Sequence, residues 1–224
     1  CSWPAYLGNN EWKKPFGAMI KAGCNLWRNW ADVQCSWASL SSIIDHWGDY
    51  GSAMAPFAGP GHWHDMDMIL VGAGCLNQDE ERTNFAIWAI SASPLIMGND
   101  IRSVPAESKA ILLNRDAIAV SQDPLGRMGL RLTALNSTLA QVWSRPLANG
   151  DVAVALYNKD DHAARDITVT FADVGMDSRT SVFDIWGGKT VGVFEGTYTA
   201  KAVPVHGTAF VRLSAQPLKM TVVV

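Results

Sequence analysis

The ionisable residues best placed to do chemistry lie in two short segments that are rich in tryptophan. Arg28 and Asp32 belong to the run CNLWRNWAD, and Asp65 and Asp67 follow a Gly-Pro-Gly turn in the run AGPGHWHDMDM. A lone charge is costly to bury among aromatic side chains, so such groups are either paired or functional. Carboxylates beside an arginine can hold a polar substrate and transfer a proton. A structural ion pair, such as Arg28 with Asp67, is the alternative interpretation.

The second segment also carries side chains of the kinds that bind metal ions. Residues two apart on a strand share a face, so His62 and His64 would point to one side, and Asp65 and Asp67 to the other. The four cysteines include no C-x₂₋₄-C pair of the kind that binds zinc. We therefore expect neither a metal site nor a cofactor.

The composition is that of a folded protein, with 48% hydrophobic and 17% charged residues. A formal net charge of −3 argues against a nucleic-acid partner, and no apolar run approaches the roughly 18 residues that cross a membrane. Ten tryptophans are present, a residue type that suits sugar pockets as well as protein cores. The cysteines, with one N-x-[ST] sequon that predicts glycosylation at Asn136, favour a secreted or luminal protein.

Two patterns of hydrophobic residues divide the chain. Up to about residue 125, apolar stretches alternate with helical patterns, which is typical of a parallel sheet with helical crossovers. Strands are expected at residues 26–30, 66–71 and 95–97, and helices at 36–49, 78–93 and 105–113. Beyond that point the period changes to two, with turn sequences between short runs. This predicts an α/β domain over residues 1–125 and an antiparallel β-sandwich over residues 126–224.

Five motifs occur in order along the chain: CSWPAY, CNLWRNWAD, AGPGHWHDMDM, AIWAISASPLIMGNDIR and SQDPLG. Together they resemble the later half of the family 27 glycoside hydrolases, and within that family the animal α-N-acetylgalactosaminidases and α-galactosidases. An eight-unit β/α barrel needs about 250 residues, so the spacing alone leaves residues 1–125 as either a small open sheet or half of a barrel. The resemblance implies the second half of a (β/α)₈ barrel followed by an antiparallel β-sandwich.

The resemblance also implies roles for individual residues. Asp32 matches the general acid and base of a retaining glycosidase. Such an enzyme needs a second carboxylate about 5 Å away as the nucleophile, and the family carries it on an earlier strand, upstream of CSWPAY. Asp65 and Asp67 are therefore not assigned that role. The residues implied to bind the sugar, the first three of them facing its 2-substituent, are Ser2, Ala5, Tyr6, Arg28, Asp67 and Met68.

The acid role places a demand on the surroundings of Asp32. It must keep its proton at the working pH, although Arg28 favours the charged form. We expect desolvation by Trp27, Trp30 and Trp37, together with the negative charge of the nucleophile, to outweigh the arginine. A mildly acidic compartment would ease this demand, which favours a lysosomal or secreted protein.

The resemblance also concerns the cysteines. Cys1 and Cys24 match a disulfide of the family. Cys35 stands where the family has Asp, and it and Cys75 are either buried thiols or a second bridge. His64 is a further departure, because the family has Asn at this position.

These expectations combine into one functional hypothesis. The chain is the C-terminal portion of a retaining exo-α-glycosidase that hydrolyses terminal α-linked N-acetylgalactosamine and, more weakly, α-linked galactose. Its partners are those glycans and the missing N-terminal half of the barrel, without which the fragment is expected to be inactive; a homodimer is left open. The alternative is a non-catalytic glycan-binding or structural fragment.

Overall fold

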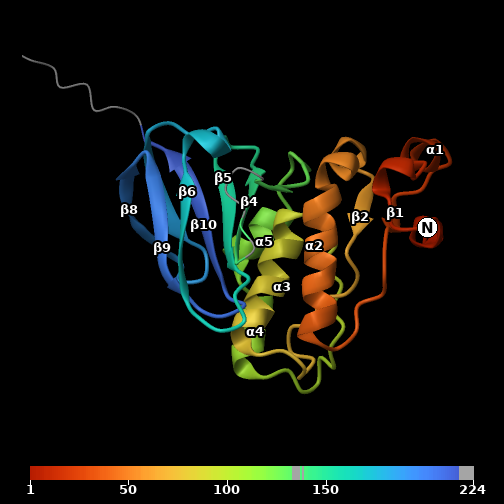
Figure 1. Ribbon diagram of the computed structural model, residues 1–224, viewed down its shortest axis with the longest axis horizontal. Coiled ribbons are helices and arrows are strands. Elements are labelled where there is room, and N and C mark those ends of the chain that lie inside the picture. Colours follow the sequence, from red (N-terminus) through yellow and green to blue (C-terminus); the bar gives the residue numbers. More distant parts are fainter. Residues whose placement is uncertain (133–136, 138, 217–224) are drawn as a thin grey trace, which may run out of the picture.

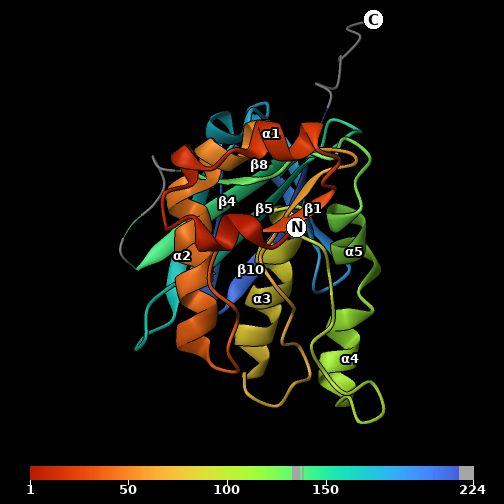
Figure 2. The same ribbon diagram turned by 90° about the vertical axis from the view of Figure 1, so that its right-hand side faces the viewer.

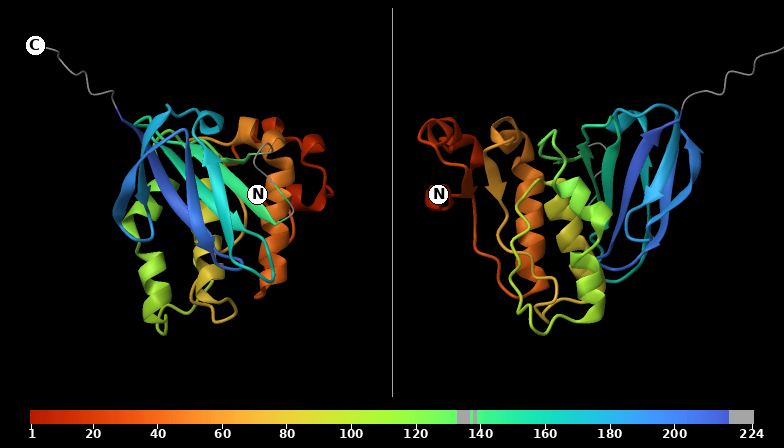
Figure 3. Two further views of the ribbon diagram at one scale, coloured as in Figure 1. Left: turned by 60° about the vertical axis from the view of Figure 1, so that its left-hand side comes forward. Right: turned by 180° about the vertical axis from the view of Figure 1, so that it is seen from behind.

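The computed structural model describes residues 1–132, 137 and 139–216, and it arranges them in layers (Figure 1). A short parallel strand pair, β1 (Leu26–Arg28) and β2 (Trp63–Asp65), lies at one side. A layer of helices follows, and antiparallel sheets cover its far side. Figure 3 shows the same order from behind, with the helices between the strand pair and the sheets.

The two longest helices of the first half begin at capping residues that the sequence provides. In α2 the Ser36 hydroxyl accepts the N–H of Ser39 and caps the helix. In α3 the Asn77 side chain accepts the N–H of Glu80, whose carboxylate accepts the N–H of Asn77 in return. The helices are α1 (Phe16–Lys21), α2 (Trp37–Met54), α3 (Gln78–Ile90), α4 (Ala106–Leu112) and α5 (Arg115–Ser121), with short 3₁₀ turns η1 (Trp3–Tyr6), η2 (Glu11–Lys13), η3 (Ala55–Phe57) and η5 (Ala172–Val174).

The strand predicted at residues 66–71 is wrong. β2 ends at Asp65, and the backbone of Asp67 takes the left-handed conformation, with a φ of 80°, which interrupts a strand. The chain then makes one isolated parallel bridge, between Ile69 and Met97, so the next predicted strand is reduced to that bridge as well. An apolar run alone gives no sign of this interruption, because polar side chains stabilise it.

The second half forms two antiparallel sheets. The larger has the strand order β3-β4-β5-β10-β7-β8, and the smaller pairs β6 with β9. The strands are β3 (Leu130–Arg131), β4 (Ala140–Pro146), β5 (Val152–Asn158), β6 (Arg165–Thr170), β7 (Arg179–Asp184), β8 (Lys189–Glu195), β9 (Thr197–Val203) and β10 (Thr208–Ala215). Two packed antiparallel sheets form the predicted sandwich.

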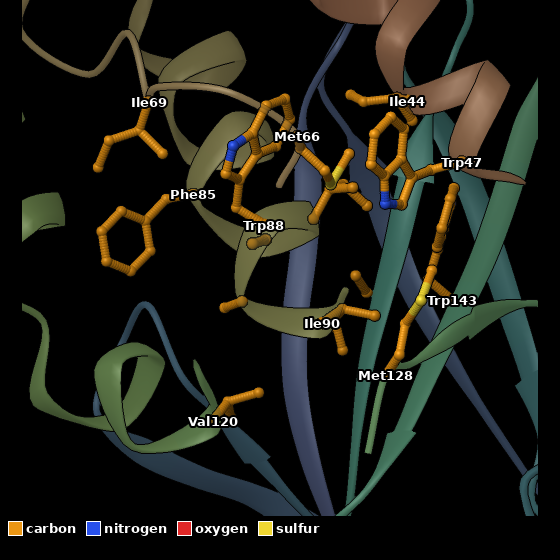
Figure 4. Close-up of a cluster of buried hydrophobic side chains, with 14 of the residues drawn as sticks. Ile44, Trp47, Met66, Ile69, Phe85, Trp88, Ile90, Val120, Met128 and Trp143 are labelled. Carbon is orange, nitrogen blue, oxygen red and sulfur yellow. The ribbon is translucent and has the colours of Figure 1, made fainter. Parts of the chain in front are cut away.

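Strand β5 contributes to two hydrophobic cores, because its side chains alternate between the two faces of the larger sheet. Ala155 and Tyr157 pack into the core beneath the helices, whereas Val154 and Leu156 pack into the core between the sheets. Every residue of this strand is buried, which explains its continuous apolar run. Figure 4 shows the helix-side core, including the large side chains Ile44, Trp47, Phe85, Trp88 and Trp143.

Among the described residues, no helix combines the length and the apolar character needed to cross a membrane. The helices α2, α3 and α4 lie side by side behind β1 and the N-terminus (Figure 2). The N-terminal segment with η1 therefore lies next to the carboxyl end of β1, where the predicted site residues begin.

Candidate active site

Arg28, the last residue of β1, lies where the predicted site residues meet. Its guanidinium contacts two carboxylates: Nη1 lies 2.8 Å from Oδ2 of Asp67, and Nη2 lies 3.1 Å from Oδ1 of Asp32. Nη2 also donates to the carbonyl of Ala31 at 2.9 Å. The ion pair considered as the structural alternative therefore forms, but the same guanidinium also orients Asp32.

The carboxylate of Asp67 is held by three donors. Besides Arg28, it accepts the backbone N–H groups of Val33 and Met68, each at 2.8 Å. The carbonyl of Asp67 accepts the indole N–H of Trp88 at 2.7 Å. These bonds join the loop after β1 to the chain after β2, and they stabilise the left-handed backbone at Asp67.

Asp65 is buried at the end of β2, where its carboxylate accepts the N–H of Asp67 at 2.9 Å. Burial raises the pKa of Asp65, because desolvation penalises the charged form, and the charge of Arg28 partly opposes this. Asp65 and Asp67 are thus both committed to local hydrogen bonds, and neither has the open position that a nucleophile needs.

Asp32 lies in an open pocket of about 280 Å³ beside η1. The pocket is lined by two chain segments, which supply Ala5, Tyr6, Asn9, Trp30, Ala31 and Asp32. Two residues implied to face the 2-substituent, Ala5 and Tyr6, therefore lie beside the residue implied to be the acid. Asp32 is the only carboxylate among these lining residues. The described part of the chain therefore supplies this pocket with one acid and no second carboxylate.

The other implied sugar contacts are not among the residues that line this pocket. Ser2 is exposed and directly precedes η1, and its carbonyl accepts the N–H of Ala5 at 3.2 Å. Met68 is 42% exposed and follows Asp67 in the chain beyond β2. Both side chains are therefore free to contact a ligand larger than the pocket itself.

The expectation that three tryptophans desolvate Asp32 is wrong, since the Asp32 side chain is 81% exposed. Trp27 is the neighbour of Arg28 on β1, so its side chain points to the opposite face of the strand from that of Arg28. Its indole N–H donates to His64 at 2.8 Å. Trp37 stacks on His206 of the sheet half, with ring centroids 4.5 Å apart. Of the three, Trp30 alone lines the pocket.

The two histidines of the AGPGHWHDMDM segment, His62 and His64, are hydrogen-bonded to other groups of the protein. Nε2 of His64 donates to the carbonyl of Met54 at 2.9 Å, and Nδ1 accepts from Trp27. Burial lowers the pKa of His64 to about 4, so the ring is neutral at physiological pH. Nδ1 of His62 lies 2.7 Å from the carbonyl of Phe57. No group of three or more His, Cys, Asp or Glu residues suited to a metal ion occurs among the described residues.

Two disulfides hold the segments that carry the site. The Cys1–Cys24 bond ties Cys1 to the segment just before β1, and the backbone nitrogen of Cys1 donates to the carbonyl of Leu26 at 2.7 Å. Cys35 and Cys75 form the second bridge, which settles the choice left open between thiols and a disulfide. This bridge ties the Asp32 loop to the loop before α3. The sequon residue Asn136 lies outside the described residues.

The sequence did not predict one residue of the pocket or the buried network that supports it. Asn9 lines it, and a buried polar network that includes Glu11 and His46 lies behind Trp30. These residues come from separate segments with no shared spacing, so no local pattern could bring them together. The two buried charges, Glu11 and Lys14, lie in the stretch between the first two motifs and gave the only hint, an acid and a base three residues apart.

Both halves of the chain match known protein families and curated relatives. The family described as "Alpha galactosidase A" matches residues 1–123, and "Alpha galactosidase C-terminal beta sandwich domain" matches residues 137–213. The chain is 37% identical over 193 residues to α-N-acetylgalactosaminidase of Gallus gallus, covering 85% of this chain and 47% of that protein. It is 39% identical over 176 residues to α-galactosidase A of Homo sapiens, covering 78% and 40%. The chain thus spans less than half the length of these relatives.

Solved structures share the fold. The crystal structure of α-galactosidase I from Mortierella vinacea matches with a TM-score of 0.75 and 29% identity, over 86% of this chain and 53% of that one. The α-galactosidase of Saccharomyces cerevisiae, solved with raffinose, matches with a TM-score of 0.75 and 25% identity, over 86% and 60%. The predicted fold class is confirmed: the second half of a β/α barrel is followed by an antiparallel β-sandwich. The chain belongs to the α-galactosidase family of glycoside hydrolases, family 27.

Proposed function

We propose that this chain forms the C-terminal part of a retaining exo-α-glycosidase that releases terminal α-linked N-acetylgalactosamine and, more weakly, α-linked galactose. The observation that carries the proposal is the pocket that Asp32 shares with Ala5 and Tyr6, together with the Arg28 bridge from Asp32 to Asp67. Relatives named for each of the two sugars support the α-linked substrate class.

Asp32 acts twice in this mechanism. It first protonates the glycosidic oxygen while a carboxylate nucleophile supplied from outside this chain bonds to C1 of the sugar. It then removes a proton from the water that attacks the glycosyl-enzyme, so the configuration at C1 is retained. Arg28 keeps the Asp32 carboxylate in place through Nη2. The desolvation that the acid role requires comes from the bound sugar and the rest of the barrel.

The family nucleophile lies in a Lys-x-Asp motif, and this chain has one such sequence, at residues 159–161. It lies between β5 and β6 in the sheet half, far along the chain from the barrel strands. Lys159 pairs with Asp45, and Asp161 lies 2.7 Å from Nε2 of His206. We assign this sequence a structural role and leave the nucleophile to the part of the barrel outside this chain.

The choice of N-acetylgalactosamine over galactose rests on Ser2 and Ala5. The resemblance implies Glu and Leu at the matching positions of the galactose-selective branch of the animal proteins. A hydroxyl and a methyl group leave room for the acetamido group at C2, and each can contact it. Gaining or losing one such contact changes the preference between the two sugars by about 1–3 kcal/mol. A steric clash with the acetamido group would reject N-acetylgalactosamine more strongly.

The setting of the protein is part of the same proposal. Two disulfides are typical of a lysosomal or secreted protein rather than a reducing compartment. Glycosylation at Asn136 and a domain boundary between residues 125 and 126 stay predictions.

A steady-state assay tests the proposed activity. The chain joined to the rest of its barrel, called here the complete-barrel protein, is assayed with the 4-nitrophenyl α-glycosides of N-acetylgalactosamine and galactose, beside the chain alone. The complete-barrel protein should cleave both, with the higher kcat/KM for N-acetylgalactosamine, and the chain alone should cleave neither. If the complete-barrel protein binds these sugars but cleaves neither glycoside, the glycan-binding alternative is favoured.

A further inference from the structure

The indole of Trp30 is held in a fixed plane at the edge of the Asp32 pocket. One face of the ring stacks on His46, with centroids 4.3 Å apart and an interplanar angle of 2°. The indole N–H donates to Oδ1 of Asn9 at 3.2 Å, and both residues line the pocket. The ring is therefore fixed on one face and at its polar edge.

A buried network of charges supports His46 from behind. Nε2 of His46 lies 2.8 Å from Oε1 of Glu11, which also accepts the Lys14 ammonium at 2.6 Å. Oε2 of Glu11 accepts the side-chain N–H of Asn29 at 3.2 Å. The Glu11 and Lys14 side chains are fully buried. Such a network contributes little net stability, because desolvation of the charges opposes their attraction. Its clear effect here is to fix the imidazole on which Trp30 stacks.

We propose that Trp30 and Asn9 form the subsite for the leaving group, and that its ligand is a pyranose ring. This inference rests on the proposed function, because it takes Asp32 as the group that protonates the leaving oxygen. Asp32 and Trp30 line one pocket, so the group attached to that oxygen lies against Trp30. The apolar face of a pyranose packs against a rigid indole. The Asn9 amide uses its oxygen for Trp30 and keeps its N–H groups for a sugar hydroxyl.

Two substrates that share the transferred sugar but differ in the leaving group test the inference. One is an α-linked disaccharide, whose leaving group is a pyranose, and the other is the α-glycosyl fluoride, whose leaving group has no ring. In the complete-barrel protein, Trp30→Ala should lower kcat/KM about tenfold or more for the disaccharide, and lower it far less for the fluoride. Trp30→Phe keeps a ring and should recover most of the disaccharide activity.

Trp12→Leu is the matched control, because Trp12 is 66% exposed in the same N-terminal segment but does not line the pocket. It should change neither substrate. If Trp30→Ala does not fold, Asn9→Ala provides the same comparison, with a smaller loss that again falls mainly on the disaccharide. Equal losses on both substrates, or no loss on either, would overturn the subsite. A wild-type protein that cleaves neither substrate would instead overturn the proposed function on which the inference rests.

Discussion

Ser2 and Ala5 are small residues at the wall of the proposed sugar site, and their size has a direct consequence for substrate choice. In the complete-barrel protein, Ser2→Glu combined with Ala5→Leu should reverse the preference from N-acetylgalactosamine to galactose. The leucine fills the acetamido space, and the glutamate offers an acceptor for a bare 2-hydroxyl. We expect the ratio of kcat/KM values for the two 4-nitrophenyl glycosides to change by 10-fold to 200-fold, as an order of magnitude.

Ala22→Leu is the control for this double change, because it adds the same bulk at an exposed position outside the pocket. It should leave the ratio as it is. A double variant that keeps its activity on N-acetylgalactosamine would show that Ser2 and Ala5 do not face the 2-substituent.

His64 makes the stability of the fold depend on pH. Burial lowers its pKa from 6.5 to about 4, so between these values the unfolded chain binds a proton that the folded chain does not. The free energy of unfolding therefore falls as the pH falls from 6.5 towards 4, by about 3 kcal/mol in total. His64→Asn should remove most of this slope.

Urea unfolding of the complete-barrel protein at pH 7 and pH 5 measures the effect. His62→Asn is the control, since this neighbouring ring is less buried, and it should keep the slope. Equal pH dependence in the wild type and in His64→Asn would mean that other groups determine it.

At the scale of elements, the loop after β1 holds Asp32 without regular secondary structure, and the Cys35–Cys75 bridge ties it down. The bridge spans 40 positions, so the chain-entropy model gives it about 4 kcal/mol of stability. The double variant Cys35→Ser with Cys75→Ser should lower the free energy of unfolding by up to that amount. It should also lower kcat more than it changes KM, because a looser loop misplaces the acid.

Guanidinium unfolding of the complete-barrel protein measures the change in the free energy of unfolding. Steady-state kinetics measures the changes in kcat and KM. Loss of stability with an unchanged kcat would show that the bridge supports the fold without positioning Asp32.

The sequence predicted best those elements that have strong local signals. The helices over α2 and α3 have capping residues and periodic apolar faces, and both form. The strand after Asp65 was misplaced, since its interruption depends on the side-chain bonds of Asp67 rather than on hydropathy. Strands β8 and β9 were not predicted, because β8 is exposed along most of its length and neither strand has a clear alternation of buried and exposed residues.

In the candidate site too, some residues could be predicted from the sequence and others could not. The Arg28–Asp32–Asp67 cluster could be proposed from motifs, because these residues lie within recognisable runs of sequence. The support of Trp30 could not, because Glu11 and His46 meet only after η2 packs against α2. Contacts between distant segments leave no spacing for a pattern to detect.

At the scale of the whole molecule, buried hydrogen bonds join the sheet half to the barrel helices. The Thr83 hydroxyl of α3 donates to the carbonyl of His206 at 2.6 Å and lies 2.7 Å from the Thr208 hydroxyl. In the same interface, the Arg145 guanidinium donates to the carbonyl of Ala89 at 2.6 Å. The sheets thus support the outer face of the helices rather than the pocket.

Thr83→Val should therefore affect stability without affecting chemistry. Removing this buried hydroxyl leaves the His206 carbonyl without its donor and the Thr208 hydroxyl without its acceptor, which costs about 1–3 kcal/mol. We expect a lower Tm for the complete-barrel protein and an unchanged kcat/KM. Thr168→Val, at an exposed position of β6, is the control and should change neither. A fall in kcat/KM for Thr83→Val would instead connect the sheet half to catalysis.

Azide rescue of Asp32→Ala in the complete-barrel protein tests the assignment of Asp32 most directly. Loss of the acid and base should lower turnover of 4-nitrophenyl α-N-acetylgalactosaminide by about 10²–10⁴-fold. Azide needs no base to attack the glycosyl-enzyme, so its addition should restore turnover and yield the α-glycosyl azide, with the configuration retained. Absence of rescue would contradict the acid and base role, and formation of the β-glycosyl azide would show that Asp32 is the nucleophile.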